Sequence, residues 1–200
     1  MLLLVGCGSS ASALFTVKSR LVGRSLEQAV ILPSGDTNDR PLLVLLHGRS
    51  SQPDDMARSS IKKAVDKLGS RAPVVLFANG GNHWYYHDRR DGRWGSYILR
   101  EAIPAAVHKY HLDRRRVAIG GFSMGGFGAL DLARFRRFCA VGGHSAAMWR
   151  TGGETPQGAF DDAEDFEQNN LIRRGASEPT PVSRGAGLDR RRHRGSVPER

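Results

Sequence analysis

The stretch RVAIGGFSMGGFGALDLARF, residues 116–135, decides the fold class. Its first part, RVAIGG, predicts a buried strand, and MGGFGALDLARF predicts a helix directly after it. Ser123 lies between the two and forms the pattern Gly-x-Ser-x-Gly with Gly121 and Gly125. Glycines on both sides permit a sharp turn that presents a serine hydroxyl at the end of a strand. The stretch therefore predicts a nucleophile elbow, and a glycine-rich turn without chemistry is the simpler alternative.

Strand and helix patterns alternate along the rest of the chain. Strands and helices that alternate at short spacing predict a mostly parallel sheet with helices on both faces, which is an α/β fold. We divide the chain into residues 1–13, a domain over 14–172, and a tail over 173–200 whose composition predicts disorder. The expected strands are 14–22, 26–32, 42–48, 72–80, 116–121 and 138–145. The expected helices are 54–69, 96–111 and one that starts at residue 124, and Pro104 is expected to kink the second helix or to lie near a break in it.

The formal net charge of +10 does not indicate a nucleic-acid-binding protein. The last thirty residues contain eight arginines and three acidic residues, so half of the excess charge lies there. The remaining residues are mildly basic and their charges are dispersed, which argues against a dedicated nucleic-acid groove. No apolar run is long enough for a membrane-spanning helix.

The two cysteines, Cys7 and Cys139, do not make a disulfide framework. Cys139 is expected in a buried strand as a small core residue. The segment LLLVGCGSSAS around Cys7 resembles the lipobox of bacterial lipoproteins, although only six residues precede the cysteine and none is basic. Two interpretations stay open: a start upstream of Met1 with export or a lipid anchor, or a chance resemblance in a cytoplasmic protein.

A nucleophilic serine needs donors for the oxyanion that forms during acyl transfer. The backbone N–H of Met124, at the start of the helix, is the first expected donor. The segment LLVLLHGRSS, residues 42–51, predicts a second buried strand that ends in a bend at Gly48. We expect the backbone N–H of Arg49, in this bend, to be the second donor.

These motifs resemble the esterase D family of the α/β-hydrolases, which includes S-formylglutathione hydrolases, feruloyl esterases and antigen 85 mycolyltransferases. The resemblance rests on LLVLLHG, GGNHWYYHDRRDGRWGSYILREAIP, RVAIGGFSMGGFGAL and FCAVGGHSAAMW, and it covers about residues 14–170. It implies esterase or acyltransferase chemistry on a small acyl ester or thioester, through an acyl-enzyme on Ser123 and without a cofactor. It also implies a substrate pocket lined by His47, Trp84, Tyr85 and Trp94.

The resemblance also implies a catalytic acid and a catalytic histidine after Ser123, and we find neither. His144, in VGGHS, is interpreted as structural, because the catalytic base of the family comes from a loop much later in the chain. His193 lies in DRRRHRG, which matches nothing in the family. His83 and His87 are spaced i, i+4 without a third ligand, so we expect no metal site.

The acidic residues after the last expected strand come too early for the catalytic acid. They are interpreted as the solvated start of a helix. These residues are Asp161, Asp162, Glu164 and Asp165.

The arginine-rich tail suggests why both catalytic partners are missing. When LDRRRHRGSVPER is back-translated and read one base later, it can give WIDVGTEDPFRS, a strand and turn similar to the acid-bearing segment of the family. We therefore expect a frameshift after about Leu171 and little or no hydrolase activity. The same loss would expose the strand at 138–143 as an apolar sheet edge prone to self-association. The alternative is a non-catalytic binding or interaction protein with a basic tail.

Overall fold

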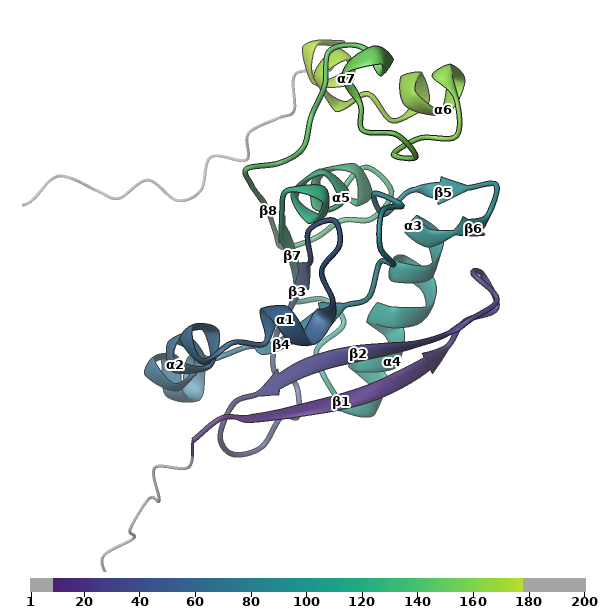
Figure 1. Cartoon of the computed structure of the whole chain (residues 1–200). Coiled ribbons are helices and arrows are strands. Elements are labelled where there is room, and N and C mark those ends of the chain that lie inside the picture. The colour runs from purple at the N-terminus through teal and green to yellow at the C-terminus, as the bar shows by residue number, and fades with distance from the viewer. Residues whose placement is uncertain (1–8, 178–200) are drawn as a thin grey trace, which may run out of the picture.

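The computed structural model describes residues 9–177 and contains a six-stranded sheet in the order β1-β2-β4-β3-β7-β8 (Figure 1). Strands β4, β3, β7 and β8 are parallel, whereas β1 and β2 are antiparallel to their neighbours. The expected α/β fold with a mostly parallel sheet is thereby confirmed. The strands are β1 (Ala11–Lys18), β2 (Ser25–Leu32), β3 (Leu42–Leu46), β4 (Val74–Ala78), β7 (Val117–Phe122) and β8 (Ala140–His144).

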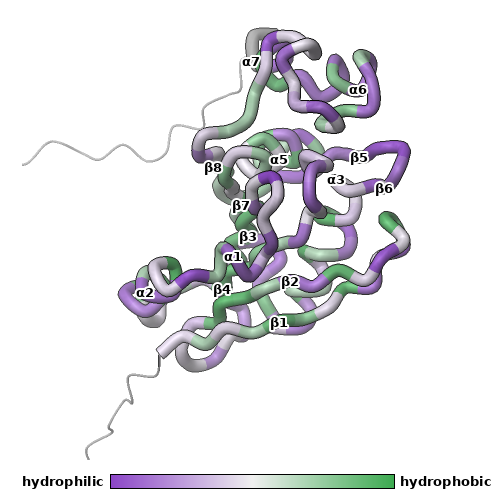
Figure 2. The backbone as a smooth tube through the Cα atoms, in the orientation of Figure 1, coloured by the Kyte–Doolittle hydropathy of each residue, from purple (hydrophilic) through white to green (hydrophobic). Residues whose placement is uncertain are grey.

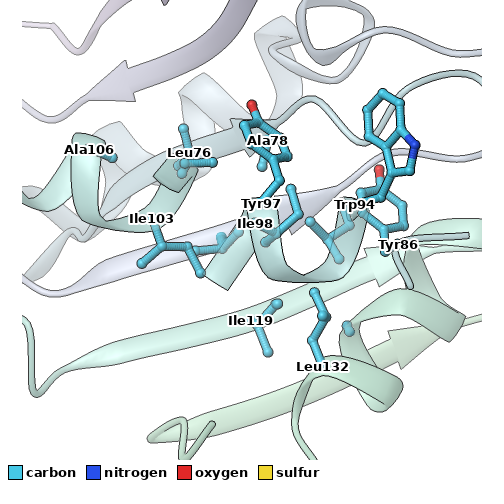
Figure 3. Packing of buried hydrophobic residues seen from close by; sticks show 14 of the residues in the cluster. Leu76, Ala78, Tyr86, Trp94, Tyr97, Ile98, Ile103, Ala106, Ile119 and Leu132 are labelled. Carbon is cyan, nitrogen blue, oxygen red and sulfur yellow. The ribbon is translucent and has the colours of Figure 1, made fainter. Parts of the chain in front are cut away.

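The main core lies between one face of the sheet and a helical layer. This layer consists of α3 (Trp94–Tyr97), a π-helical segment η2 (Ile98–Ala102), α4 (Ile103–Lys109) and α5 (Met124–Leu132). Figure 3 shows Tyr97, Ile98 and Ile103 in one buried cluster with the strand residues Leu76 and Ile119. All five side chains are at most 2% exposed, so this packing supplies the rigid base on which α5 and the elbow rest.

The opposite face of the sheet carries a smaller core. Helix α2 (Ser59–Leu68) covers it with Ile61 and Val65, which pack with Ile31, Val75 and Phe77 of the strands. The expected helix 54–69 is divided, because α1 (Pro53–Met56) ends before Arg58, whose backbone is extended (φ −77°, ψ 161°) and whose guanidinium donates to the Asp55 carbonyl. A 3-10 turn, η1 (Gly69–Arg71), follows α2.

Two expected boundaries move for local reasons. Strand β1 ends at Lys18 and not at residue 22, because the Ser19 hydroxyl accepts the N–H groups of Leu21 and Val22 and starts the turn there. The helix expected at 96–111 begins at Trp94, and Pro104 does not break it. The π-helical segment η2 runs directly into α4, so the regular α-helical hydrogen-bond pattern is interrupted just before Pro104.

The loop between β4 and α3 contains a short hairpin that the sequence pattern did not predict. Its strands are β5 (Asp88–Arg89) and β6 (Gly92–Arg93), and their polar residues give no alternation to detect. Figure 2 shows this hairpin as a hydrophilic segment beside the more apolar strands of the sheet. Just before it, Tyr85 and Tyr86 both have positive φ angles, 50° and 61°.

After β8 the chain folds over α5 through η3 (Gly152–Glu154), α6 (Ala163–Gln168) and α7 (Leu171–Ser177) (Figure 1). The expected disorder from residue 173 is therefore wrong for 173–177. The missed signal was Asn170, whose side-chain oxygen accepts the Arg173 N–H at 3.1 Å and caps α7. Cys7 and residues 178–200, including His193, lie outside the described residues.

Strand β8 is an edge strand, and all five of its residues are exposed. Cys139, directly before it, is also exposed, so its expected place in the core is wrong. The physical reason is that among residues 9–177 no element covers the outer side of this strand. Within residues 9–177, β8 therefore lies at an exposed edge of the sheet.

Candidate active site

Ser123 occupies a sharp turn between β7 and α5. Its backbone has φ 54° and ψ −114°, a conformation that a non-glycine residue adopts only when its surroundings impose it. Here the Ser123 N–H donates to the His144 carbonyl at 3.0 Å, and its own carbonyl accepts from Phe127 and Ala147 at 3.1 Å each. The turn is therefore fixed from both sides, by α5 and by the end of β8 with the chain that follows it.

Glycines surround this turn because there is no room for a Cβ atom. A Cβ on Gly121 would overlap the backbone of Gly125, and a Cβ on Gly125 would overlap the carbonyl of Leu46. A Cβ on Gly126 would lie 2.9 Å from the Ala146 Cα. The Gly-x-Ser-x-Gly pattern thus reflects close backbone contact between α5, β7 and the end of β3.

The predicted oxyanion donors lie beside Ser123. Strands β3 and β7 are neighbours, and Leu46 pairs with Gly121 in their register. A Cβ built on Gly48 would lie 3.8 Å from the Ser123 Cβ, which places the bend before Arg49 next to the serine. The backbone N–H groups of Met124 and Arg49 make no hydrogen bond within the described part of the chain, as an oxyanion donor requires.

A cavity of about 390 Å³ adjoins the same bend. Its lining includes Gly48 and Arg49 and three apolar side chains, those of Met56, Ile61 and Phe122. The remaining lining residues are polar or charged: Ser51, Asp55, Arg58 and Ser60. Phe122, the residue before the serine, is 49% exposed. The arrangement offers an apolar surface within reach of the Ser123 turn.

His47 does not belong to this surface, contrary to its predicted place in a substrate pocket. Its ring is buried, its Nδ1 lies 2.9 Å from the Gly48 carbonyl, and its Nε2 lies 3.2 Å from the Gly80 nitrogen, which donates to it. Burial lowers the pKa of His47, although the bond to Gly48 opposes the shift. A neutral imidazole with Nδ1–H donating satisfies both bonds, so His47 shapes the bend at Gly48.

Three aromatic residues of the 83–94 loop, Trp84, Tyr85 and Trp94, pack against other rings. Trp94 is 1% exposed and stacks on Trp84, which in turn stacks on His83, with ring centroids 4.6 and 4.2 Å apart. Tyr85 is also buried, and it packs against Phe127, Trp149 and Phe160. Burial raises the pKa of the Tyr85 hydroxyl, and the positive charge of Arg49 opposes this shift.

No histidine of the described residues donates to, or accepts from, the Ser123 hydroxyl. The His144 ring lies against Phe122, with centroids 5.6 Å apart, and meets Ser123 only through its backbone carbonyl. His87 lies 3.0 Å from Asp165 and stacks on Phe160. Residues 9–177 also contain no group of three or more His, Cys, Asp or Glu side chains suited to a metal ion.

The acidic run after residue 160 is a helix start, as expected, but it is not simply solvated. Asp162 caps α6 by accepting the Asp165 N–H at 2.9 Å. Asp161 accepts two hydrogen bonds from the Arg89 guanidinium, and Asp165 is hydrogen-bonded to His87. These carboxylates fix the 84–93 loop, a role that only the tertiary fold reveals.

Comparison with known proteins identifies the fold and the family. The "Putative esterase" family model matches residues 19–184. The chain is 31% identical over 101 residues to the bifunctional acetylxylan esterase/xylanase of Neocallimastix patriciarum, across 48% of this chain and 14% of that protein.

Two solved structures illustrate the similarity in three dimensions. The S-formylglutathione hydrolase FrmB of Staphylococcus aureus has a TM-score of 0.56 at 25% identity, over 67% of this chain and 56% of that one. A CE1 ferulic acid esterase of Anaeromyces mucronatus, at 21% identity, shares the fold with a TM-score of 0.60, over 75% of this chain and 64% of that one.

The chain spans less than two thirds of the length of each of these relatives. Within the described residues, no helix has the length and apolarity needed to cross a bilayer. The fold, the glycine-bounded turn at Ser123 and the match over most of the chain lead to one conclusion: this protein belongs to the Putative esterase family of the α/β-hydrolases.

Proposed function

We propose that the protein is a serine esterase whose nucleophile is Ser123. The observation that carries this proposal is the strained Ser123 turn (φ 54°), which lies against Gly48 and has two unpaired N–H groups beside it. Strain of this kind persists where a side chain must be presented in one orientation, and it is common in active sites. The names of the relatives, an acetylxylan esterase, a ferulic acid esterase and an S-formylglutathione hydrolase, support an ester or thioester substrate.

In this mechanism the Ser123 Oγ attacks the acyl carbonyl while a base takes its proton. The carbonyl oxygen becomes an oxyanion, which the N–H groups of Met124 and Arg49 and the positive end of α5 stabilise. Loss of the alcohol or thiol leaves an acyl group on Ser123, which water or another alcohol then removes. The apolar surface formed by Met56, Ile61 and Phe122 would contact the acyl or alcohol part of the substrate.

We further propose that these 200 residues alone turn esters over slowly. A serine hydroxyl needs a base, and no histidine among residues 9–177 contacts Ser123 Oγ. Oxyanion stabilisation and substrate binding without the base leave a rate about 10³–10⁴-fold above that in water. We therefore expect slow covalent labelling of Ser123 to be easier to detect than catalytic turnover.

Hydrolysis of p-nitrophenyl acetate by the wild type and the Ser123→Ala variant tests both statements. We expect weak hydrolysis that is abolished in Ser123→Ala, together with acetylation of Ser123 detectable by mass spectrometry. Equal hydrolysis by both proteins would show that Ser123 is not the nucleophile. Fast turnover that depends on Ser123 would show instead that a base acts on it, and would overturn the second statement alone.

A further inference from the structure

A second cavity lies at the C-terminal end of α5, opposite the end that carries Ser123. Its volume is about 570 Å³, within the range of small-molecule sites. Asp131 and Leu132 of α5 line it, together with Phe135 and Arg136 directly after the helix and His87 from the aromatic loop. Neither Ser123 nor its expected oxyanion donors contribute to it, so it is separate from the ester site.

Two buried polar atoms belong to residues that line this cavity and have no partner among the described residues. They are Oδ2 of Asp131 and Nδ1 of His87. The other polar atom of each side chain is occupied, since Asp131 Oδ1 accepts from Arg134 and His87 Nε2 bonds Asp165. The residues are 0% and 2% exposed, and leaving such atoms unpaired costs about 1–3 kcal/mol each.

Two cationic side chains on the same cavity are also unpaired. Arg93 pairs with Asp88 and Arg134 pairs with Asp131, but Arg100 and Arg136 have no carboxylate partner among the described residues. Arg136 is partly buried against Phe138, and this burial lowers the pKa of its guanidinium. A desolvated guanidinium without a counter-ion favours the arrival of an anion.

We propose that this cavity binds a small polyhydroxylated organic anion, with its acidic group on Arg136 and Arg100 and its hydroxyl groups toward Asp131 and His87. Hydroxyl groups are donors that suit a carboxylate oxygen and an unprotonated imidazole nitrogen. The two unpaired arginines exclude a cation as the main ligand. The apolar walls, Leu99, Leu132 and Phe135, suit the carbon skeleton of a sugar acid or sugar phosphate.

Isothermal titration calorimetry with four probes tests the proposal on the full chain. The probes are D-glucuronate, glucose 6-phosphate, glucose without an acidic group, and hexanoate without hydroxyl groups. We expect saturable binding of glucuronate or glucose 6-phosphate, and affinities about tenfold weaker or worse for both glucose and hexanoate, because each lacks one of the two recognised features.

Matched variants locate the site. Arg136→Gln is expected to weaken binding of the anionic sugar at least tenfold, whereas Arg137→Gln, the exposed neighbour outside the cavity, leaves it unchanged. Circular dichroism verifies that both variants fold. Ser123→Ala is expected to bind the sugar normally, which separates this site from the proposed ester site. Absence of saturation by both anionic sugars, or equal loss in Arg136→Gln and Arg137→Gln, would overturn the proposal.

Discussion

At the scale of single residues, the Ser123 turn depends on neighbouring glycines, which have no Cβ atom. A Cβ on Gly125 would overlap the Leu46 carbonyl, and backbone on both sides leaves no flexible group that could move away. We expect Gly125→Ala to lower the free energy of unfolding by about 1–3 kcal/mol and to abolish acetylation of Ser123. Urea denaturation and mass spectrometry measure the two effects.

Gly142→Ala is the matched control, because a Cβ at Gly142 in β8 meets nothing within 4 Å. Its unfolding free energy should stay within about 0.5 kcal/mol of the wild type. If Gly125→Ala is equally harmless, the close packing between α5 and β3 does not exist as described.

The residues of the candidate site differ in how far sequence alone could place them. Ser123 and Gly125 were identifiable because a local pattern, strand, turn and helix, carries the information. His47 was expected in the substrate pocket only because the resemblance to the family implied it. Its actual partners, the Gly48 carbonyl and the Gly80 N–H, are known only once β3 and β4 lie side by side.

At the scale of elements, β8 forms an edge whose backbone groups can pair with another chain. Its residues are all exposed, and Val141 retains 43% of its surface. We expect the wild type to self-associate with rising concentration in sedimentation velocity experiments, and Val141→Lys to shift it toward the monomer, because a charge on an edge strand opposes pairing.

Leu68→Lys provides the comparison, since Leu68 is similarly exposed (44%) but ends α2, away from the sheet edge. It should leave self-association as in the wild type. An equal effect of both lysines would indicate association through general hydrophobicity. A wild type that is monomeric at all concentrations would show that the edge is not used.

Some helices and strands could be predicted from the sequence and others could not, because only some of them leave a hydrophobic pattern. Apolar runs located β3, β4 and β7, because strands buried on both faces leave a continuous hydrophobic signal. The break between α1 and α2 and the β5–β6 hairpin gave no such signal. The break between α1 and α2 follows from the extended backbone of Arg58. The hairpin is held by polar residues such as Arg89, which donates a hydrogen bond to Asp161, far along the chain.

At the scale of the whole molecule, the segment after β8 is joined to the body by buried polar contacts. Arg89, 7% exposed at its side chain, donates to Asp161 at 2.7 and 3.0 Å and to the Gly158 carbonyl at 2.6 Å. Burial raises the pKa of Asp161, but the bonds from Arg90 N–H and Arg89 outweigh it, so the pKa lies below the ordinary 3.8. The carboxylate is therefore charged in the folded protein.

We expect Arg89→Ala to lower the free energy of unfolding by about 2–3 kcal/mol near pH 7, because it leaves Asp161 without its main partner. Limited proteolysis should then cut residues 146–162 faster. Since folding depresses the Asp161 pKa, this stabilisation is full above the ordinary value and is lost as the pH falls below it. The difference between wild type and variant should thus shrink as the pH falls below 3.8.

Arg90→Ala serves as the control, because Arg90 pairs with Asp162 while its side chain is 76% exposed. An exposed ion pair contributes about 0–1 kcal/mol, so this variant should resist proteolysis nearly as the wild type does. If the two alanine variants behave alike, burial of the Arg89 contact is not what holds the segment in place.

If only Arg89→Ala releases it, the 84–93 loop and the segment after β8 are stabilised as one unit. His87 lines the cavity at the end of α5, and Asp165 is hydrogen-bonded to His87. Both residues belong to that unit.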